Sequence, residues 1–492
     1  MKELLDHAAC YAAIKSHDTR FDGRFFVGVS STGIYCRPIC RVKTPKAENC
    51  TFYPSAAAAE AAGFRPCLKC RPELAPGNSA MDASSRLARS AALAMEEEYF
   101  AEDGLAGLAG LAERLNVSDR HLRRVFSAEY GVSPIQYAQT RKLLLAKHLL
   151  TDTPLSITET ALSSGFGSIR RFNDVFKKHY RLSPRDLRKT DGKVQEKDDS
   201  GITLLLGYRP PYDWKGILAF LEGRAVPGVE CAENGGYLRT VAMESGEDTL
   251  RGWICVSDVP TKNALSVTVS PSLLPVLPKL LAKIRALFDT DCNPAEIADG
   301  LATLGDHAAR PYNSGTRLPG CIDPFEMTVR AVLGQQITVK AARTLAMRFA
   351  AAFGENITTP FPQLTRTFPT HTAIARLEPP VEDKLGPLGI TGARSRSIFA
   401  LAKALTDGTL SLARHADPEE EMRKLLALPG FGPWTVEYVA MRALAWPDAF
   451  PHTDYGVKKA LEHLAPKELL QTAEKWRPWR SYATIALWNS LG

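Results

Sequence analysis

The chain has 492 residues, of which 45% are hydrophobic and 23% are charged, as is ordinary for a folded globular protein. This length predicts about three or four domains, each able to bury its own core. No run of about 18 apolar residues occurs, and the segment Met1–Phe26 lacks the apolar centre of a signal peptide. We therefore expect a cytoplasmic protein with reduced thiols, which argues against a disulfide-bonded scaffold.

Positive charge is concentrated in one part of the sequence. The formal net charge is +7, and between Leu105 and Lys189 there are 15 Lys or Arg against 7 Asp or Glu, a local excess of +8. A basic segment of this kind favours nucleic-acid binding, although solvated helix faces would give the same count. The order of residues within the segment has to decide between nucleic-acid binding and solvated helix faces.

Four of the ten cysteines fall in two close pairs. Three residues separate the first pair, two separate the second, and 26 residues lie between the pairs. Four thiols with this spacing, among several arginines, suit a tetrahedral Zn²⁺ site better than buried free cysteines. The predicted ligands are Cys36, Cys40, Cys67 and Cys70. Cys10 and Cys50 lie outside the spacing and are expected to pack in the core.

The residues around these cysteines, GIYCRPIC and ENCTFYPSAAAAEAAGFRPCLKCRP, resemble the N-terminal domain of Ada-type DNA-repair regulators. In that family the first cysteine of the quartet, here Cys36, accepts a methyl group from a methylphosphotriester in DNA. Four thiolates on Zn²⁺ carry a net charge of about −2, so a bound sulfur keeps its nucleophilicity at neutral pH. Methylation would lower that charge and weaken repulsion of the DNA phosphates. The resemblance thus implies a single-use methyl acceptor that also switches DNA binding.

An internal repeat with an offset of 50 residues lies in the basic segment. The pattern V-F-x3-Y-x2-S-P begins at Val125 and again at Val175. Before each copy we expect a short helix, a turn and an arginine-bearing helix, with Ser118 and Ser168 as N-caps. The stretch FKKHYRLSPRDLRK resembles the signature of AraC-type DNA-binding domains. That resemblance implies two helix-turn-helix units that enter successive major grooves, whereas a protein-interaction bundle is the alternative.

The candidate DNA contacts of this segment are basic side chains. The second helix of each unit is expected to read base edges, and Lys177 and Lys178 to meet phosphates. The predicted base readers are Arg120, Arg123, Arg124, Arg170 and Arg171. The resemblance also implies promoter DNA and RNA polymerase as partners. Residues 76–85 and 190–200 are polar and are predicted to be linkers.

After residue 202 the pattern changes to short strands and then to helices. Strands are predicted at Ile202–Leu206, Leu238–Met243, Arg251–Val256 and Ala264–Val269, and helices at Trp214–Leu221 and Leu277–Phe288. This pattern indicates an antiparallel α+β lobe. Beyond residue 293 almost the whole chain is predicted to be helical, including Met327–Gln336 and Val339–Phe353.

A turn rich in glycine and proline, Leu428–Pro433, separates two apolar helical segments. Such a hairpin leaves N–H groups free at the start of the next helix, where they can bind a phosphate. Four stretches, YRPPYDWKGILAFL, LPGCIDPFEMTVRAVLGQQIT, LPGFGPWTVEYVAMRAL and WRPWRSYATIALW, resemble DNA-3-methyladenine glycosylase II of the AlkA type. The resemblance runs from about residue 202 to the end. It implies a helix-hairpin-helix fold, alkylated double-stranded DNA as substrate, Gly430 and Gly432 at the DNA backbone, and a monovalent cation at the hairpin.

Asp454 follows the hairpin and matches the catalytic carboxylate of that family, whereas Asp448 does not. A carboxylate there would stabilise the oxocarbenium-like sugar that remains when the base departs. The base must leave the duplex, and electron-rich rings would favour a cationic base. The positions that match the family's base pocket are Phe220, Trp434, Tyr438, Tyr455 and Trp488.

Departures from related families limit the chemistry. Trp434 stands where strand-cleaving relatives carry a lysine for Schiff-base formation, so we expect a monofunctional enzyme that leaves an abasic site. Gln336 stands where an apolar residue often fills the gap left by the flipped base. No Pro-Cys-His-Arg motif occurs, so direct repair of alkylguanine is not predicted.

The sequence therefore predicts a multidomain chain of α+β and all-α domains. These are a small zinc α+β domain (1–76), an all-α tandem helix-turn-helix domain (86–190), an antiparallel α+β lobe (202–288) and an all-α helix-hairpin-helix glycosylase domain (293–492). The predicted function is excision of alkylated bases such as 3-methyladenine, fused to a methyl acceptor and regulator of the adaptive response. The alternative is a methylation-sensing regulator whose C-terminal half binds DNA without base excision.

Overall fold

The computed structural model describes residues 6–77, 86–97, 104–191, 201–246, 248–308 and 311–491. Contacts divide the chain into two compact units. Unit 1 comprises residues 1–210, 259–282 and 290–292, and unit 2 comprises residues 211–258, 283–289 and 293–492. Most of both predicted linkers lies outside the described residues. Among the helices that are described, none has the length and apolar character needed to cross a membrane.

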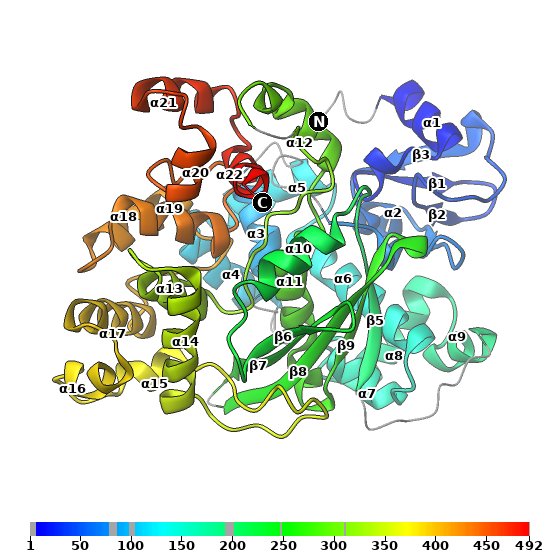
Figure 1. Ribbon diagram of the computed structural model, residues 1–492. Helices are drawn as coiled ribbons and strands as arrows, with labels where there is room; N and C mark the ends of the chain where they lie inside the picture. Colours follow the sequence, from blue (N-terminus) through cyan, green and yellow to red (C-terminus); the bar gives the residue numbers. More distant parts are fainter. Residues whose placement is uncertain are drawn as a thin grey trace. The chain divides into compact units, whose positions relative to one another are not determined.

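The N-terminal part of unit 1 is the predicted α+β module (Figure 1). Its sheet has the strand order β3-β1-β2-β4, with β1 antiparallel to β2 and β3, and β2 parallel to β4. Phe25 and Tyr35 are completely buried at this sheet. The elements are α1 (His7–Ser16), β1 (Phe26–Val29), β2 (Ile34–Cys36), β3 (Cys50–Tyr53), α2 (Ala56–Ala61) and β4 (Arg65–Pro66).

The basic segment of unit 1 forms two similar helical units, as the repeat predicts. Both predicted N-caps are confirmed, because the Ser118 and Ser168 hydroxyls accept backbone N–H bonds at the starts of α5 and α8. In each copy the repeated Phe and Tyr rings lie with centroids 4.6 Å apart. The helices are α3 (Arg86–Glu97), α4 (Gly104–Arg114), α5 (Asp119–Tyr130), α6 (Pro134–Asp152), α7 (Ile157–Ser163), α8 (Ile169–Tyr180) and α9 (Pro184–Asp191).

The long helix α6 joins the two helical units and also packs against the zinc module. The Lys147 ammonium donates to both carboxylate oxygens of Glu73 at 2.6 Å, and the two side chains are almost fully buried. Arg71, next to the last predicted zinc ligand, contacts Glu73 at 2.9 Å and Asp152 at 2.8 Å. Burial raises the pKa of Glu73, but Lys147 and Arg71 outweigh it and hold that pKa below its usual value.

Antiparallel strands confirm the α+β pattern predicted after residue 202. In unit 1, β5 (Ile202–Gly207) pairs with β9 (Ala264–Val269). In unit 2, β7 (Gly236–Ser245) pairs with both β6 (Glu230–Glu233) and β8 (Asp248–Val259). The sequence did not predict β6, a four-residue strand with a glutamate at each end.

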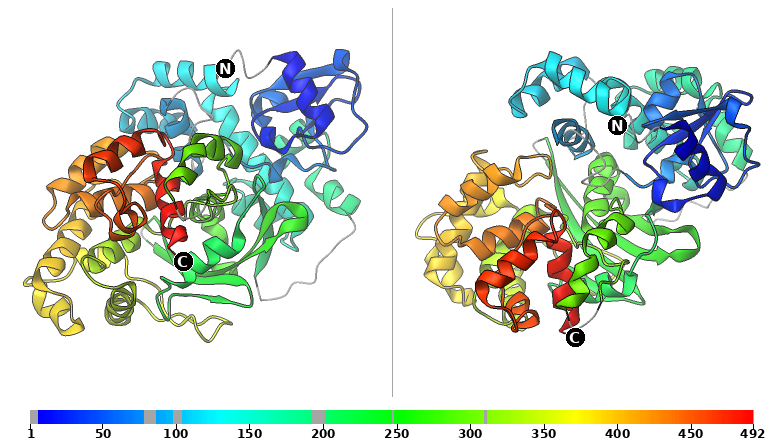
Figure 2. Two further views of the ribbon diagram at one scale, coloured as in Figure 1. Left: turned by 45° about the horizontal axis from the view of Figure 1, so that its top comes forward. Right: turned by 90° about the horizontal axis from the view of Figure 1, so that it is seen from above.

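The remaining helices begin with α10 (Trp214–Glu222) and α11 (Leu277–Leu287). In Figures 1 and 2 the later helices of unit 2, coloured green to red, gather into one helical body that ends at the C-terminus. They are α12 (Pro294–Gly300), α13 (Pro324–Leu333), α14 (Val339–Phe353), α15 (His371–Ala375), α16 (Glu382–Leu385), α17 (Gly392–Thr406), α18 (Pro418–Ala427), α19 (Pro433–Arg442), α20 (Tyr455–Ala460), α21 (Pro466–Glu474) and α22 (Arg480–Ser490).

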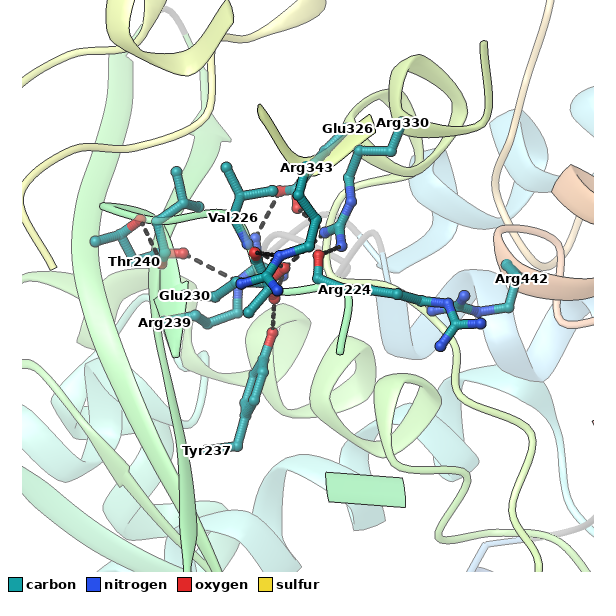
Figure 3. A network of polar contacts seen from close by, with 12 residues as sticks. Arg224, Val226, Glu230, Tyr237, Arg239, Thr240, Glu326, Arg330, Arg343 and Arg442 are labelled. Carbon is teal, nitrogen blue, oxygen red and sulfur yellow. Dashed lines mark hydrogen bonds and ion pairs between the residues drawn. The ribbon is translucent and has the colours of Figure 1, made fainter. Parts of the chain in front are cut away.

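A buried ion network holds α13 against the strands of unit 2 (Figure 3). Arg330 donates to Glu230 at 2.7 Å and to Glu326 at 2.8 Å, and Arg239 donates to Glu326 at 2.6 Å. The Tyr237 hydroxyl completes the network by donating to Glu230. Because each carboxylate has at least one guanidinium partner, the cost of burying these charges is offset.

The Lys147–Glu73 pair supplies a test of how the zinc module is fixed to α6. Replacing Lys147 by Met should lower the free energy of unfolding of unit 1 by about 3 kcal/mol, because it leaves the Glu73 carboxylate buried with Arg71 alone. Urea unfolding measures this change. The control is Lys46→Met, since Lys46 and Glu48 form an exposed pair 3.5 Å apart whose loss should cost little. Equal stability of both variants and the wild type would contradict this view of the interface.

Candidate active site and zinc centre

The hairpin at Leu428–Pro433 joins α18 to α19 and is fixed from two sides. Gly430 has φ +79°, and a Cβ added there would lie 2.1 Å from the Ser397 hydroxyl oxygen. On the other side, the Gln335 amide donates to the Gly430 carbonyl at 3.0 Å and to the Thr435 hydroxyl at 2.9 Å. The hairpin is therefore tied to the loop after α13, a contact that sequence reasoning missed.

The Asp454 carboxylate is held by four N–H donors. One oxygen, Oδ1, accepts the backbone N–H groups of Gly456 (2.8 Å) and Val457 (3.1 Å) and the indole N–H of Trp488 (2.8 Å). The other oxygen, Oδ2, accepts the indole N–H of Trp434 at 2.9 Å. Asp454 thus caps α20 and also presents a carboxylate whose orientation is fixed by two tryptophans.

A cavity of about 400 Å³ opens beside this carboxylate. Trp434 and Tyr438 lie in its wall and stack with ring centroids 5.4 Å apart. Tyr455 is 77% exposed, which places it at the mouth of the cavity. Four of the five predicted pocket residues therefore line this space: Trp434, Tyr438, Tyr455 and Trp488.

Phe220, the fifth predicted pocket residue, does not line the cavity. Its ring is 8% exposed and stacks on Trp488 with centroids 6.2 Å apart. The guanidinium of Arg224 lies over the same ring at 3.8 Å, and that of Arg442 at 4.8 Å. The Phe220 ring therefore packs against Trp488 of the cavity wall, and the guanidinium groups of Arg224 and Arg442 lie over its faces.

The arginines around the cavity were not predicted from the sequence. Arg224, Arg330, Arg343 and Arg442 all line it. Burial raises the pKa of the Tyr438 hydroxyl, but Arg442, Arg224 and Arg330 outweigh burial and bring that pKa below its usual value. The cavity is thus aromatic and also strongly cationic, with Asp454 as the carboxylate in its lining.

The neighbouring candidates occupy different environments. Asp448 forms ion pairs with Arg477 at 2.5 Å and Arg480 at 2.7 Å, so it has a structural role apart from the cavity.

Helix α13 ends at Leu333, three residues before the predicted end. Gln336 consequently lies in the following loop, exposed and with φ +55°, a backbone conformation that non-glycine residues adopt at a cost.

The four predicted zinc ligands come together in unit 1. Their sulfur atoms all lie within 4.8 Å of one another. Four Zn–S bonds of about 2.3 Å in a tetrahedron require sulfur atoms roughly 3.8 Å apart, so the donor set fits a single Zn²⁺. Cys10 and Cys50 are buried outside the cluster, and burial raises the pKa of Cys10 to about 11, as expected for packing residues.

A backbone N–H group contacts one sulfur of the cluster. The N–H of Arg37 donates to Cys70 Sγ at 3.4 Å. Cys36 is 6% exposed, so access to its sulfur is narrow.

The predicted base readers lie on α5 and α8, the second helix of each helix-turn-helix unit. Arg120, Arg124, Arg170 and Arg171 are exposed, as are Lys177 and Lys178. Arg123 is half-buried, and its Nε donates to both carboxylate oxygens of Asp119 at 2.9–3.0 Å. That ion pair would have to open or rotate before Arg123 could reach a base edge.

Gly430 and Gly432 give a matched test of the hairpin. Gly430→Ala should lower the free energy of unfolding of unit 2 by about 1–2 kcal/mol, because alanine is strained at φ +79° and meets Ser397. Gly432→Ala should change it little, since Gly432 has φ −90° and no atom within 4 Å of an added Cβ. Urea unfolding compares the two variants, and a larger loss at Gly432 would contradict the geometry.

Comparison with known protein families identifies four successive segments. The metal binding domain of Ada matches residues 9–73, and a helix-turn-helix domain matches residues 111–190. The AlkA N-terminal domain matches residues 203–323. The HhH-GPD superfamily of base excision DNA repair proteins matches residues 329–477.

Individual relatives cover either the whole chain or one part of it. A probable bifunctional transcriptional activator/DNA repair enzyme AlkA of Mycobacterium tuberculosis is 36% identical over 99% of this chain and 97% of that protein. DNA-3-methyladenine glycosylase 2 of Escherichia coli is 38% identical over 58% of this chain and 97% of that protein. The bifunctional transcriptional activator/DNA repair enzyme Ada of Escherichia coli is 33% identical over 32% of this chain and 42% of that protein.

Proposed function

Because the chain belongs to the family of AlkA-type bifunctional transcriptional activator/DNA repair enzymes, we propose that it excises alkylated bases from DNA and regulates transcription. The excision site is the cavity beside Asp454 in unit 2, and the methyl acceptor is Cys36 in unit 1. The functional parts extend over residues 1–76, 86–190, 202–288 and 293–492.

The observation that carries the excision activity is the Asp454 carboxylate at the aromatic cavity. When the glycosidic bond breaks, its electron pair leaves with the base, and positive charge develops on the sugar. Oδ1 already accepts three N–H donors, whereas Oδ2 accepts one, so Oδ2 keeps lone-pair capacity to face the sugar. Water then adds to the anomeric carbon and loses a proton, which gives an abasic site.

The residues around Asp454 also define what the site does not do. Trp434 donates its indole N–H to the carboxylate, so it occupies the place where a Schiff-base lysine would need to lie. These side chains support the activity of a monofunctional glycosylase.

The hairpin contacts the duplex backbone at Gly430 and Gly432. Gln336, in the exposed loop after α13, is available to fill the gap that the flipped base leaves.

Asp454→Asn tests this assignment. The amide keeps the size of the side chain but cannot stabilise positive charge, so release of 3-methyladenine from methylated DNA should fall by about 10³-fold or more. The released base is measured chromatographically under single-turnover conditions. Equal release by variant and wild type would exclude Asp454 from the chemistry, and no release by the wild type would favour a regulator that binds DNA without excision.

Methyl transfer at the cysteine cluster is the second proposed activity. The Cys36 sulfur attacks the methyl carbon of a methylphosphotriester, the carbon–oxygen bond breaks, and an ordinary phosphodiester anion leaves. Bound Zn²⁺ would keep the four sulfurs deprotonated at neutral pH. Cys36 is the first cysteine of the quartet, the position that accepts the methyl group in Ada-type proteins, and residues 9–73 match the metal binding domain of Ada, which supports it as the acceptor.

Cys36→Ala should abolish methyl transfer from a phosphotriester oligonucleotide, and Cys10→Ala should retain it because Cys10 lies outside the cluster. Mass spectrometry of peptides from the wild-type protein locates the methyl group without relying on a variant that has lost a zinc ligand. A methyl group found on Cys40, Cys67 or Cys70, or full transfer by Cys36→Ala, would contradict the assignment.

The helix-turn-helix units supply the regulatory part of the proposal. Exposed arginines and lysines on α5 and α8 fit a duplex whose phosphates and base edges are contacted in successive grooves. Loss of one negative charge at the methylated cluster would favour DNA binding by unit 1. RNA polymerase is the partner proposed for activation, and a monovalent cation is proposed at the hairpin carbonyls.

A further inference from the structure

Arg209 belongs by sequence to the glycosylase half but lies against the zinc module. It follows β5, within the segment that matches the AlkA N-terminal domain, and it is 1% exposed. Its Nε donates to the Asp22 carbonyl at 3.0 Å, and its terminal nitrogens donate to the carbonyls of Gly77 at 2.8 Å and Asp291 at 2.6 Å. All four residues belong to unit 1, so these contacts lie within one compact body.

The main chain that Arg209 joins is packed without spare space. A Cβ added at Gly207, the last residue of β5, would lie 2.0 Å from the Leu74 carbonyl oxygen. The Gly77 N–H donates to the Asp291 carboxylate at 2.9 Å. The stretch that follows the last zinc ligand is therefore in backbone contact with the end of β5.

The Asp22 carboxylate connects Arg209 with the cysteine cluster. Arg37 Nε donates to Asp22 Oδ1 at 2.8 Å, and a terminal nitrogen of Arg37 donates to Oδ2. Both side chains are buried. A bidentate pair of this kind has a narrow range of geometries, so the direction of Arg37 depends on where Asp22 is held.

Arg37 in turn joins the two cysteine pairs. It directly follows Cys36, and its guanidinium donates to the Cys70 carbonyl at 3.1 Å. Its backbone N–H donates to Cys70 Sγ at 3.4 Å. Partners of this kind fix the directions of metal ligands, and their loss typically costs 10- to 100-fold in metal affinity or activity. The orientation of the Cys36 segment therefore depends on Arg37.

The guanidinium of Arg209 is suited to fixing these segments. It has five N–H donors in a rigid planar fork, so one side chain can hold several carbonyls in defined directions. An apolar side chain of the same length would fill the space but would leave the Asp22 and Gly77 carbonyls without these donors. Arg209 thus fixes one segment that precedes the cysteine cluster and one that follows it.

We propose that Arg209 is a positioning residue for methyl transfer at Cys36. Arg209 fixes the main chain at Asp22, and the Asp22 carboxylate fixes Arg37. Arg37 holds the Cys36 segment against Cys70. The methyl acceptor of this chain therefore depends on a residue of its glycosylase half.

This inference rests on the proposed methyl-acceptor function of Cys36. The covalent step is the one already given: the methyl carbon passes from a phosphotriester oxygen to the Cys36 sulfur, and a phosphodiester anion leaves. Arg209 acts on this step through Asp22 and Arg37, without contact to the reacting atoms.

The test uses the full-length protein, loaded with Zn²⁺ for activity and with Co²⁺ for spectroscopy. Arg209→Met keeps an unbranched side chain but removes every donor. Single-turnover methyl transfer from a methylphosphotriester oligonucleotide should fall by about 10-fold. The visible absorption bands of Co²⁺ bound by four thiolates should shift, because they report the directions of the ligands. A loss of stability alone would not move the bands of the folded protein.

Two further variants separate positioning from folding. Arg209→Lys keeps the charge and part of the donor set, so its transfer rate and its spectrum should be intermediate, and it decides the question if Arg209→Met does not fold. Arg20→Met removes an exposed arginine of the same module, paired with Asp18 at 2.7 Å, and should change neither measurement. Release of 3-methyladenine, assigned to unit 2, should change less than about 3-fold in every variant.

Several results would overturn the inference. Methyl transfer at the wild-type rate by Arg209→Met, whatever its spectrum, would remove Arg209 from the role and leave the methyl-acceptor function intact. Slower transfer with an unchanged cobalt spectrum, or an equal loss of methyl transfer and base release, would show that Arg209 only stabilises the fold. A wild-type protein that transfers no methyl group would refute the methyl-acceptor function, and the inference with it.

Discussion

The catalytic half of this protein depends on the way one carboxylate is held. Asp454 begins α20, and its oxygens accept two backbone N–H groups and the indole N–H groups of Trp434 and Trp488. Donors of this kind fix the direction of the carboxylate, because a shift of either indole would break a hydrogen bond. The same two tryptophans form the cavity wall, so the position of the base and the position of the charge are set together.

In both proposed sites, N–H groups donate hydrogen bonds to an anionic group. In unit 1, the backbone N–H of Arg37 donates to Cys70 Sγ of the cysteine cluster. In unit 2, four N–H groups hold Asp454, and the guanidinium groups of Arg224, Arg330, Arg343 and Arg442 line the same cavity.

The sequence predicted ligands and motifs better than it predicted contacts. The zinc ligands follow from local spacing, since close pairs of cysteines bring their sulfurs together in almost any tight turn. Trp488 was predicted as a stacking ring, but its bond to Asp454, 34 residues away, depends on the orientation of α22. Arg224 and Arg442 gave no signal because they meet on Phe220 only after folding. The helix predicted through Gln336 ended early, at Leu333, because the following loop turns back toward the hairpin.

The central claim is that hydrogen bonds from two indole N–H groups fix the Asp454 carboxylate. The rate of base release by a Trp434→Phe/Trp488→Phe double variant tests this claim most directly. Phenylalanine keeps an aromatic wall but removes both side-chain N–H donors. Single-turnover release of 3-methyladenine should fall by about 10²-fold or more, with each single variant intermediate, because the two backbone N–H donors that remain, both on Oδ1, do not fix the direction of the carboxylate alone. Release at the wild-type rate by the folded double variant would contradict the account.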